Sequence, residues 1–367
     1  MSKKRVVFAI DRMNIGGAPS VVFEQMKQID KSKFEVFLLT LYRSKQANYF
    51  DRLDFLDEDH IVSFSLYKRS LLDIRTWFKV FSFLKKNNID VVYTHLFLTN
   101  VVVRTAAWLA RVPTIISTEH STYFNKHTWQ IIVDRILAKV TTSIVVARPE
   151  IADFTADQEK ISRDKFIIIA NPLSLPEPDT QVLDELSEKY IIKQNSFNVL
   201  TIGRFQEEKG HQYLIDAMKL LQDMDITCMI VGHGPLHEKL EQRIKAHGLE
   251  SSCKVIKEPE KAKYFYYLAD LFVLPSLREG QSIVTYEAFA AGLPVVASNL
   301  PTLQDVVEDG VNGYLIPTKD ITALAAKIES LYEDREVYKG FQEHTSSAIE
   351  SYQNMSSIKH LENLFIK

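Results

Sequence analysis

The stretch from Phe272 to Ser298, FVLPSLREGQSIVTYEAFAAGLPVVAS, is typical of a strand, a loop, a helix and a second strand in succession. We expect strands at Phe272–Leu274 and Val295–Ala297, with a helix at Ile283–Ala291 between them. Gly292 follows the helix as its C′ residue, and the proline two residues later prevents the helix from continuing. A strand–helix–strand unit of this kind is the building block of a parallel sheet.

The loop of this unit is expected to bind an anion. It lies at the carboxyl end of the first strand, where a helix N-terminus offers unpaired N–H groups and a partial positive charge. Glu279 in the loop and Glu287 in the helix have seven residues between them, and the helix rises about 7 to 8 Å from Ser282 to Glu287. Two carboxylates at this separation can hold opposite ends of one elongated ligand, such as a nucleotide sugar. The alternative is that both are ordinary solvated acids.

Strands and helices alternate along the rest of the chain, which predicts parallel sheets with right-handed crossovers. The polar, proline-containing segment Ser174–Thr180 follows Asn171-Pro172 and interrupts this alternation. Its composition is typical of a linker. A second series of strands begins at Phe197, so the sequence predicts two domains of the α/β class.

The composition is that of a globular protein. The chain has 367 residues, of which 46% are hydrophobic and 25% charged, enough for two sizeable cores. Its two cysteines form neither a disulfide framework nor a metal-binding spacing. The apolar run near the N-terminus is too short for a signal peptide, and no run approaches a membrane span, so we expect a cytoplasmic protein.

The arrangement of Glu279 and Glu287 resembles the glutamate–x7–glutamate motif of retaining glycosyltransferases of the two-Rossmann-domain (GT-B) type, specifically family four. The resemblance implies an α/β fold in which two Rossmann-like domains face each other across a cleft. It implies an acceptor-side domain at residues 1–173, a nucleotide-sugar-binding domain at 174–350, and a C-terminal helix at 351–367 that crosses back to the first domain.

Further segments carry the same resemblance. Arg204 and Lys209, in the loop Gly203–Gly210, match the pair that neutralises the departing nucleoside diphosphate, a role that suits the planar fork of arginine and the point charge of lysine. Gly232 matches a turn on the nucleotide side. The residues after Glu279 complete the expected donor site: Gly280, Gln281, Ser282 and Ile283. The spacing of Arg204 and Lys209 alone would also fit a solvated loop. The segment Val255–Pro259 departs from the family pattern at the place where the nucleotide base is held.

In the first half, Gly16 and Gly17 match the family loop that lies over the donor diphosphate and the acceptor, although Ala18-Pro19-Ser20 departs from the usual continuation. Paired glycines before a helix also form simple turns. His120 ends a predicted strand and resembles the family histidine that contacts the donor sugar and phosphate. His95 ends another predicted strand, but the resemblance supports a donor contact less strongly for His95 than for His120. Single histidines are more often structural.

The segment Ser70–Lys86 is a basic, amphipathic helix with two interpretations. It could lie on the inner face of a membrane as a peripheral contact, or it could pack its apolar stripe on the sheet. The charge balance is mildly basic in the first 180 residues, with 25 Lys and Arg against 20 Asp and Glu.

The function implied by the resemblance is transfer of a sugar from a nucleotide donor, expected to be a UDP-sugar, to a hydroxyl group of a carbohydrate or lipid-linked acceptor with retained configuration. Bacterial-type surface polysaccharide or glycolipid synthesis is the expected setting, with no nucleic-acid partner. Glu279, His120, Arg204 and Lys209 would be catalytic, and no metal or other cofactor is expected. Two alternatives remain open: a nucleotide-sugar epimerase on the same fold, and an inactive nucleotide-sugar-binding subunit.

Overall fold

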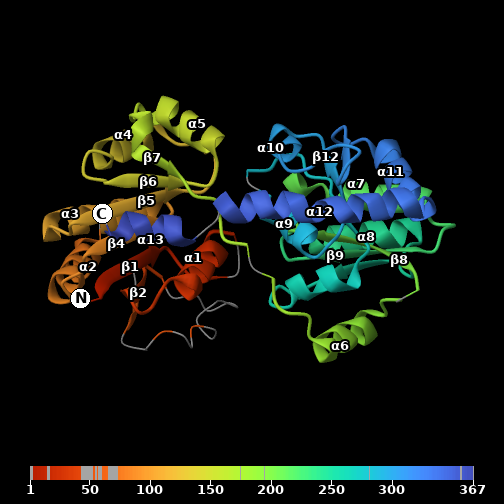
Figure 1. Cartoon of the computed structure of the whole chain (residues 1–367), viewed down its shortest axis with the longest axis horizontal. Coiled ribbons are helices and arrows are strands. Elements are labelled where there is room, and N and C mark those ends of the chain that lie inside the picture. Colours follow the sequence, from red (N-terminus) through yellow and green to blue (C-terminus); the bar gives the residue numbers. More distant parts are fainter. Residues whose placement is uncertain are drawn as a thin grey trace. The chain divides into compact units, whose positions relative to one another are not determined.

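The computed structural model describes residues 3–366 except 15–16, 43–52, 54–55, 57–59, 65–72, 174, 194, 281 and 356–357. The chain forms two compact units (Figure 1). The first comprises Met1–Pro172 together with Asn354–Lys367, and the second comprises Leu173–Gln353. Both ends of the chain therefore belong to the same unit.

The first unit is built on a parallel sheet whose described strands have the order β3-β2-β1-β4-β5-β6-β7. The strands are β1 (Lys4–Ile10), β2 (Phe34–Thr40), β3 (Ile61–Ser63), β4 (Val91–His95), β5 (Thr114–Glu119), β6 (Ser143–Val146) and β7 (Phe166–Ile168). The chain runs outward from β1 to β3 and then returns to β4 on the other side of β1. The carboxyl ends of β1 and β4 thus form a topological switch point, the place where α/β sheets bind ligands.

Helices cover both faces of this sheet, because alternate strand residues point to opposite faces. Phe8 packs with α1 (Gly17–Gln28) and α13 (Ile358–Ile366) in one core cluster. Val7 packs on the other face with α2 (Ile74–Lys86) and α3 (Phe97–Ala110). Farther along the sheet, α4 (Thr128–Leu137) and α5 (Pro149–Glu159) follow β5 and β6.

The amphipathic helix expected at 70–86 is α2, of which residues 70–72 lie outside the described part. Val80 and Leu84 belong to the core cluster under the helix, which confirms that its apolar stripe packs on the sheet. Ile74 and Phe78 are exposed on the same helix. The core therefore uses only part of the apolar surface of α2.

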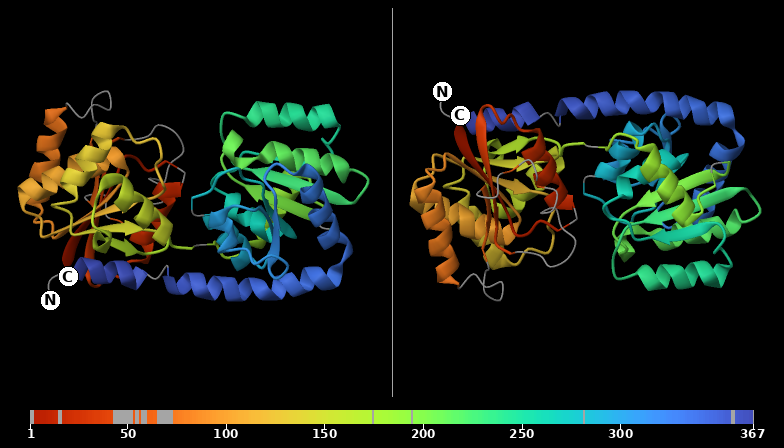
Figure 2. Two further views of the ribbon diagram at one scale, coloured as in Figure 1. Left: turned by 90° about the horizontal axis from the view of Figure 1, so that it is seen from above. Right: turned by 90° about the horizontal axis from the view of Figure 1, so that it is seen from below.

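The C-terminal end of the chain completes the core of the first unit. The C-terminal helix expected at 351–367 falls into two described helices, the end of α12 (Arg335–Met355) and α13. Phe365 of α13 is fully buried and makes edge contacts with Phe8, Phe34 and Tyr93, at centroid distances of 5.8 to 5.9 Å. Figure 2 shows α13 lying along the first unit.

We expect Phe365→Leu to lower the free energy of unfolding of the first unit by about 1.5 kcal/mol, because the aromatic contacts are lost while most of the volume is kept. The tryptophans Trp77, Trp108 and Trp129 all belong to this unit, so tryptophan fluorescence during urea denaturation reports on it selectively. The matched control is Ile366→Ala, at the exposed neighbouring position, which should change the midpoint little. Equal shifts for the two variants would contradict a core role for α13.

The second unit repeats the plan with a described strand order of β10-β9-β8-β11-β12-β13, all parallel. Its strands are β8 (Phe197–Ile202), β9 (Ile226–Val231), β10 (Cys253–Ile256), β11 (Leu271–Leu274), β12 (Val295–Ser298) and β13 (Gly313–Ile316). Its described helices, besides α12, are α6 (Thr180–Tyr190), α7 (His211–Leu220), α8 (His237–His247), α9 (Ile283–Ala290), α10 (Pro301–Gln304) and α11 (Ile321–Glu333). The switch point lies between β8 and β11.

The stretch Phe272–Ser298 folds as the sequence predicts, into β11, α9 and β12. Gly292 has φ +77°, a left-handed conformation that favours glycine. The Leu293 N–H donates to the Ala288 carbonyl at 2.9 Å and the Gly292 N–H to the Phe289 carbonyl at 2.9 Å. These two bonds form a Schellman motif that ends α9 and turns the chain into β12.

Candidate active site

The ammonium group of Lys209 and the carboxylate of Glu279 form an ion pair at the carboxyl end of the second sheet. Lys209 Nζ lies 2.7 Å from Glu279 Oε1 and 2.9 Å from Oε2. The Ser276 hydroxyl donates to Oε1 at 2.6 Å. The Glu279 side chain is 6% exposed and the Lys209 side chain 18%. The structure thus brings together two of the predicted site residues, which are 70 positions apart.

A glycine allows the loops that carry these two residues to touch. The loop after β8 contains a 3-10 turn at Glu207–Lys209 and ends at Gly210, which has φ +67°. A Cβ atom at Gly210 would lie 2.0 Å from the Pro275 carbonyl oxygen, so no larger residue fits. The Leu277 N–H donates to the Glu208 carbonyl at 2.7 Å and closes the contact. Glycine at 210 is therefore required for the Lys209–Glu279 pair.

Gly232 joins a third loop to the other two. A Cβ atom at this position would lie 1.9 Å from the Gly203 carbonyl oxygen. The Phe205 N–H donates to the His233 carbonyl at 2.8 Å. The loops after β8, β9 and β11 therefore form one connected surface at the switch point.

Glu287 lies on α9, is 5% exposed, and has partners that sequence reasoning did not find. Lys263 Nζ lies 3.0 Å from Oε1, and the Tyr266 hydroxyl donates to Oε2 at 3.1 Å. Both partners belong to the 3-10 helix Ala262–Leu268. Burial, reinforced by the Glu287 carboxylate, raises the pKa of Tyr266 well above its usual value, so the phenol stays a donor. The sequence carries only the aromatic run Tyr264–Tyr267 as a signal for this element, and nothing in that run indicates its contact with Glu287.

The other predicted donor-site residues of this unit lie around α9 and at the surface. Gly280 is in the loop, Ile283 begins α9, and Gln281 lies outside the described residues. The Ser282 hydroxyl contacts the Thr285 hydroxyl at 2.9 Å and does not cap the helix. Arg204 is 58% exposed and pairs with Glu208 at 3.3 Å. Of the two predicted cations, Lys209 is therefore the one next to Glu279.

His95 and His120 meet at the carboxyl edge of the first sheet. His95 ends β4 and His120 follows β5, with His95 Nδ1 3.1 Å from His120 Nε2. Burial lowers the pKa of His120 to about 4, and burial together with His120 lowers the pKa of His95 well below its usual value. Both imidazoles are therefore neutral at pH 7, and one ring donates a hydrogen bond to the other. The pair supplies polar, uncharged hydrogen-bonding groups.

The paired glycines of the first unit are less informative. Gly16 lies outside the described residues. Gly17 begins α1, and a Cβ atom there would meet nothing within 4 Å. The structure gives no steric reason for glycine at position 17, so its role over the diphosphate stays a prediction.

A buried charge cluster next to His120 was not predicted. Lys126 Nζ lies 3.0 Å from an Asp134 oxygen, 2.5 Å from a Glu159 oxygen and 3.5 Å from Glu119. Arg104 of α3 lies 3.5 Å from Asp134. The three carboxylates have the proximity of metal ligands, but an ammonium already stands among them. The cluster ties the loop before α4 to α3, α4 and α5.

The cluster also shifts the pKa values of its own side chains. Burial, opposed by Lys126, raises the pKa of Glu119 to about 8. Burial disfavours the charge of Lys126, but the surrounding carboxylates outweigh it and raise the pKa of the ammonium. Glu119 is therefore largely protonated at pH 7, which reduces repulsion among the buried acids.

Comparison with known proteins gives family matches to most of the chain. Residues 15–175 match the model described as Glycosyltransferase Family 4, and residues 183–347 match Glycosyl transferases group 1. The chain is 24% identical over 337 residues to the Escherichia coli UDP-Gal:alpha-D-GlcNAc-diphosphoundecaprenol alpha-1,3-galactosyltransferase, covering 88% of this chain and 86% of that protein.

Two solved structures have the same fold. A glycosyltransferase from Rickettsia africae ESF-5 matches with a TM-score of 0.80 and 17% identity over 100% of both chains. Anabaena Alr3699/HepE, solved in complex with UDP-glucose, matches with a TM-score of 0.77 and 19% identity over 99% of this chain and 98% of that one. The two parallel sheets with their covering helices therefore form the α/β fold of the GT-B type.

Proposed function

We propose, because this chain belongs to glycosyltransferase family 4 and has the GT-B fold, that it transfers a sugar from a UDP-sugar to a hydroxyl acceptor with retention of the anomeric configuration. The observation that carries the proposal is the Lys209–Glu279 pair, held by three loops at the switch point of the second sheet. The UDP-Gal donor of the Escherichia coli relative and the UDP-glucose bound to the Anabaena protein support a UDP-sugar.

The proposed chemistry is electrostatic. The bond between the anomeric carbon and the diphosphate breaks, the acceptor oxygen bonds to that carbon on the same face, and the acceptor proton passes to a diphosphate oxygen. Lys209 and the N-terminus of α9 stabilise the charge that develops on the leaving diphosphate. Arg204, on the same loop as Lys209, adds a flexible guanidinium. Glu279 orients sugar hydroxyls while it holds the Lys209 ammonium in place.

The nucleoside is assigned to Glu287. Its carboxylate is held by Lys263 and Tyr266, and carboxylate oxygens accept further hydrogen bonds from the two ribose hydroxyls. In the first unit, neutral His120 is assigned to the donor sugar, with its ring fixed by His95. The ribose of the donor is thus assigned to Glu287, and its transferred sugar to His120.

For the acceptor, we propose a carbohydrate or lipid-linked hydroxyl compound in bacterial-type polysaccharide or glycolipid synthesis. The diphosphoundecaprenol-linked acceptor printed in the name of the Escherichia coli relative supports a lipid-linked sugar.

The test is to incubate the protein with UDP-glucose, UDP-galactose and UDP-N-acetylglucosamine, each with sugar and lipid-linked acceptors. Acceptor-dependent release of UDP, with an axial anomeric linkage from an axial donor by NMR, is the expected result. An epimeric UDP-sugar without UDP release would identify an epimerase. Binding without either product would identify an inactive subunit, and inverted configuration would contradict the retaining mechanism.

We expect transfer to persist in EDTA, because Lys209 and the α9 N-terminus supply the positive charge that a divalent ion supplies in other transferases. The chain has Asp-x-Asp sequences at 57–59, outside the described residues, and at Asp223–Asp225, which precedes β9 at the amino end of the sheet. The second is therefore at the opposite end of the sheet from Lys209. Loss of activity on chelation, restored by Mg²⁺ or Mn²⁺, would contradict this assignment.

A further inference from the structure

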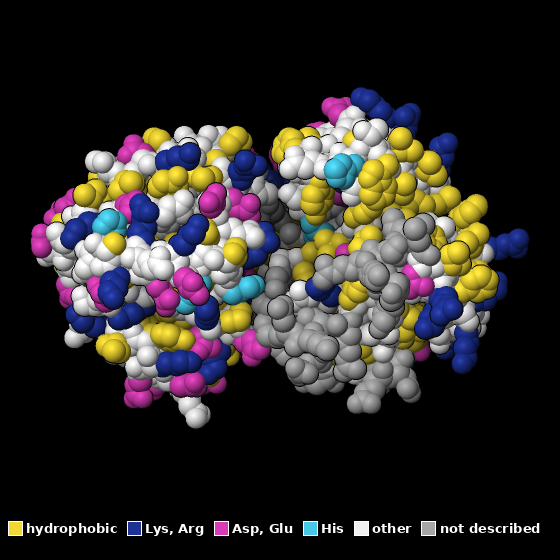
Figure 3. Space-filling model, turned by 180° about the vertical axis from the view of Figure 1, so that it is seen from behind, with side chains coloured by type: hydrophobic (Ala, Val, Ile, Leu, Met, Phe, Trp, Pro, Cys, Tyr) yellow, Lys and Arg dark blue, Asp and Glu magenta, His cyan; other side chains and the backbone are white. Residues whose placement is uncertain are grey.

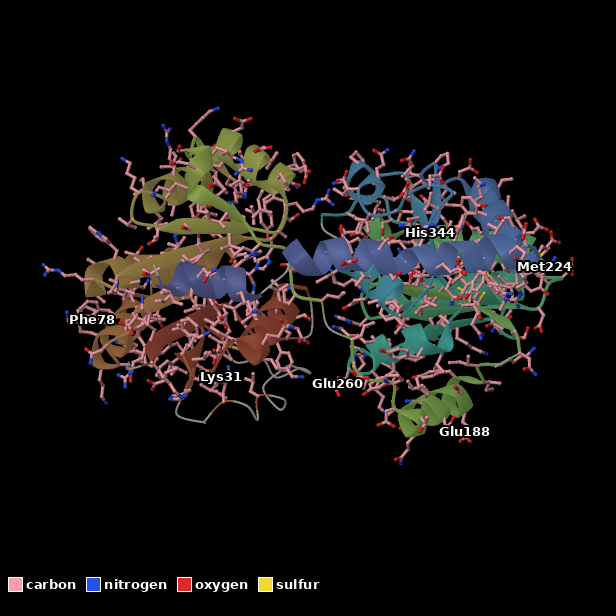
Figure 4. All side chains as sticks on the ribbon, in the orientation of Figure 1. Lys31, Phe78, Glu188, Met224, Glu260 and His344 are labelled. Atoms are coloured by element: carbon pink, nitrogen blue, oxygen red, sulfur yellow. The ribbon has the colours of Figure 1, made fainter. Side chains whose placement is uncertain are left out.

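The second unit carries charged side chains of both signs on the face seen in Figure 3, where they are interspersed and form no patch of one sign. An exposed acid such as Glu188 on α6 is solvated and needs no protein partner (Figure 4). A buried ionisable group is more informative, because burying a polar group without a hydrogen bond costs free energy. His211, the first residue of α7, is such a group and is 1% exposed.

The His211 imidazole lies against the loop that follows β8. A Cβ atom built at Gly203 would lie 3.6 Å from His211 Nε2 and 3.6 Å from Lys209 Cδ, so these two side chains both border the glycine. The ring of Phe205 meets the imidazole edge to face, with centroids 5.8 Å apart. The imidazole is therefore packed against the same loop that carries Lys209 to the candidate active site.

The two ring nitrogens of His211 are not satisfied. Neither Nδ1 nor Nε2 has a hydrogen-bond partner among the residues that the structure describes. Burial lowers the pKa of His211 to about 4, although the nearby backbone of Arg204 and Gly203 favours its proton. The imidazole is thus neutral at pH 7, with one N–H donor that lacks an acceptor. An apolar side chain would fill this place without that cost, so the histidine requires a functional explanation.

The side chain of Arg204, on the same loop, has a contact that is easily broken. It is 58% exposed and lies 3.3 Å from Glu208. An exposed ion pair of this kind contributes little to stability, so a bound diphosphate can draw the guanidinium away from Glu208 at small cost. The loop can therefore adopt two arrangements, one with Arg204 on Glu208 and one with Arg204 on the diphosphate.

The backbone of Arg204 offers the acceptor that His211 lacks. Its carbonyl accepts a hydrogen bond from the Gln206 N–H at 2.8 Å, and a carbonyl oxygen has a second lone pair. The Arg204 backbone lies close enough to favour the proton of His211, but the two do not form a hydrogen bond in this arrangement. A small shift of the loop would complete that bond.

We propose that His211 is a positioning residue for Arg204: when a nucleoside diphosphate draws the guanidinium from Glu208, the His211 ring donates to the Arg204 carbonyl and fixes the shifted loop. The unpaired imidazole is then satisfied only in the occupied site. Its hydrogen bond adds to the differential affinity by which the ligand shifts the loop. This inference rests on the proposed function, because it concerns how the second unit holds the leaving diphosphate.

The test is a double-mutant cycle on the affinity for UDP, measured by calorimetry. His211→Phe keeps a planar ring of similar size and removes the N–H, and it should weaken UDP binding about three- to tenfold. Arg204→Ala should weaken UDP binding about tenfold in the otherwise unchanged protein, but less than about threefold when His211 is already Phe. His211→Gln keeps an N–H donor and should retain more affinity than His211→Phe.

Two controls separate positioning from simple packing. Thr201, on β8, also has a buried hydroxyl without a partner in the described part of the chain, so Thr201→Val removes the same kind of group. It should leave the effect of Arg204→Ala unchanged. Lys209 is held by Glu279, so the effects of Lys209→Gln and His211→Phe should be additive. Urea denaturation followed by circular dichroism checks that each variant folds.

An equal effect of Arg204→Ala with His211 and with Phe at position 211 would overturn the inference and leave His211 as a space-filling residue. An affinity for UDP that does not depend on Arg204 would overturn it as well. In a crystal structure with UDP, we expect a His211 ring nitrogen within about 3.2 Å of the Arg204 carbonyl oxygen. Calorimetry with UDP needs neither acceptor nor turnover, so a protein that binds UDP but transfers no sugar would contradict the proposed function without contradicting this coupling.

Discussion

Lys209→Gln is expected to slow sugar transfer by about two to three orders of magnitude, the usual cost of removing one group that stabilises transition-state charge. The substitution removes the ammonium proposed to face the leaving diphosphate. It also leaves the Glu279 carboxylate, which is 6% exposed, without its cation. Both effects act on the same step, so kcat should fall more than the affinity for the donor sugar.

The measurement is kcat and KM with the UDP-sugar that gives the highest activity, together with the dissociation constant of UDP by calorimetry. Lys219→Gln is the matched control, because Lys219 lies on α7 and donates to the His247 carbonyl at 3.0 Å, away from the three loops. Lys209→Arg keeps a positive charge and should retain more activity than Lys209→Gln. A normal rate in Lys209→Gln would remove the ion pair from the mechanism.

His120→Ala is expected to reduce turnover about 10- to 100-fold while changing the affinity for UDP less than about twofold. His120 is assigned to the donor sugar, and UDP has no sugar beyond its ribose. The loops assigned to UDP belong to the second unit, whereas His120 belongs to the first. A residue that acts on the transferred sugar should therefore affect kcat without affecting UDP binding.

The control for this prediction is His360→Ala, at an exposed position on α13 of the same unit. Transfer assays stopped at fixed times give the turnover of the two variants, and calorimetry with UDP gives their affinity for UDP. Parallel losses of turnover and UDP affinity in His120→Ala, or no loss in turnover, would place His120 outside the reaction.

The sequence predicted the fold best where local chemistry determines it. The buried strand Leu271–Leu274, the helix ended by Gly292 and the return to β12 follow from residues that are neighbours in the chain. The same holds for β8 (Phe197–Ile202), which begins at the predicted residue, Phe197. Each element carries its own start and stop signals, so no distant contact is needed to place it.

The site was harder to predict because its contacts are distant in sequence. Nothing local to Glu287 indicates that Tyr266 and Lys263 hold its carboxylate. The cluster around Lys126 likewise joins residues from separate helices and loops. Resemblance placed Arg204 and Lys209 together, but the structure puts only Lys209 against Glu279, since side-chain direction is set by packing and not by spacing. The roles assigned to these residues stay predictions.

The docking of α13 on the first sheet has a consequence for how the protein forms on the ribosome. Phe365 fills a core whose other residues, such as Phe8 and Phe34, are synthesised at the very beginning. Translation of the 181 residues of Leu173–Gln353 comes in between, which takes roughly 10 to 35 s at 5 to 20 residues per second. During that interval we expect the nascent first unit to lack the core side chains Leu361, Leu364 and Phe365, so its apolar core stays incomplete until α13 is synthesised.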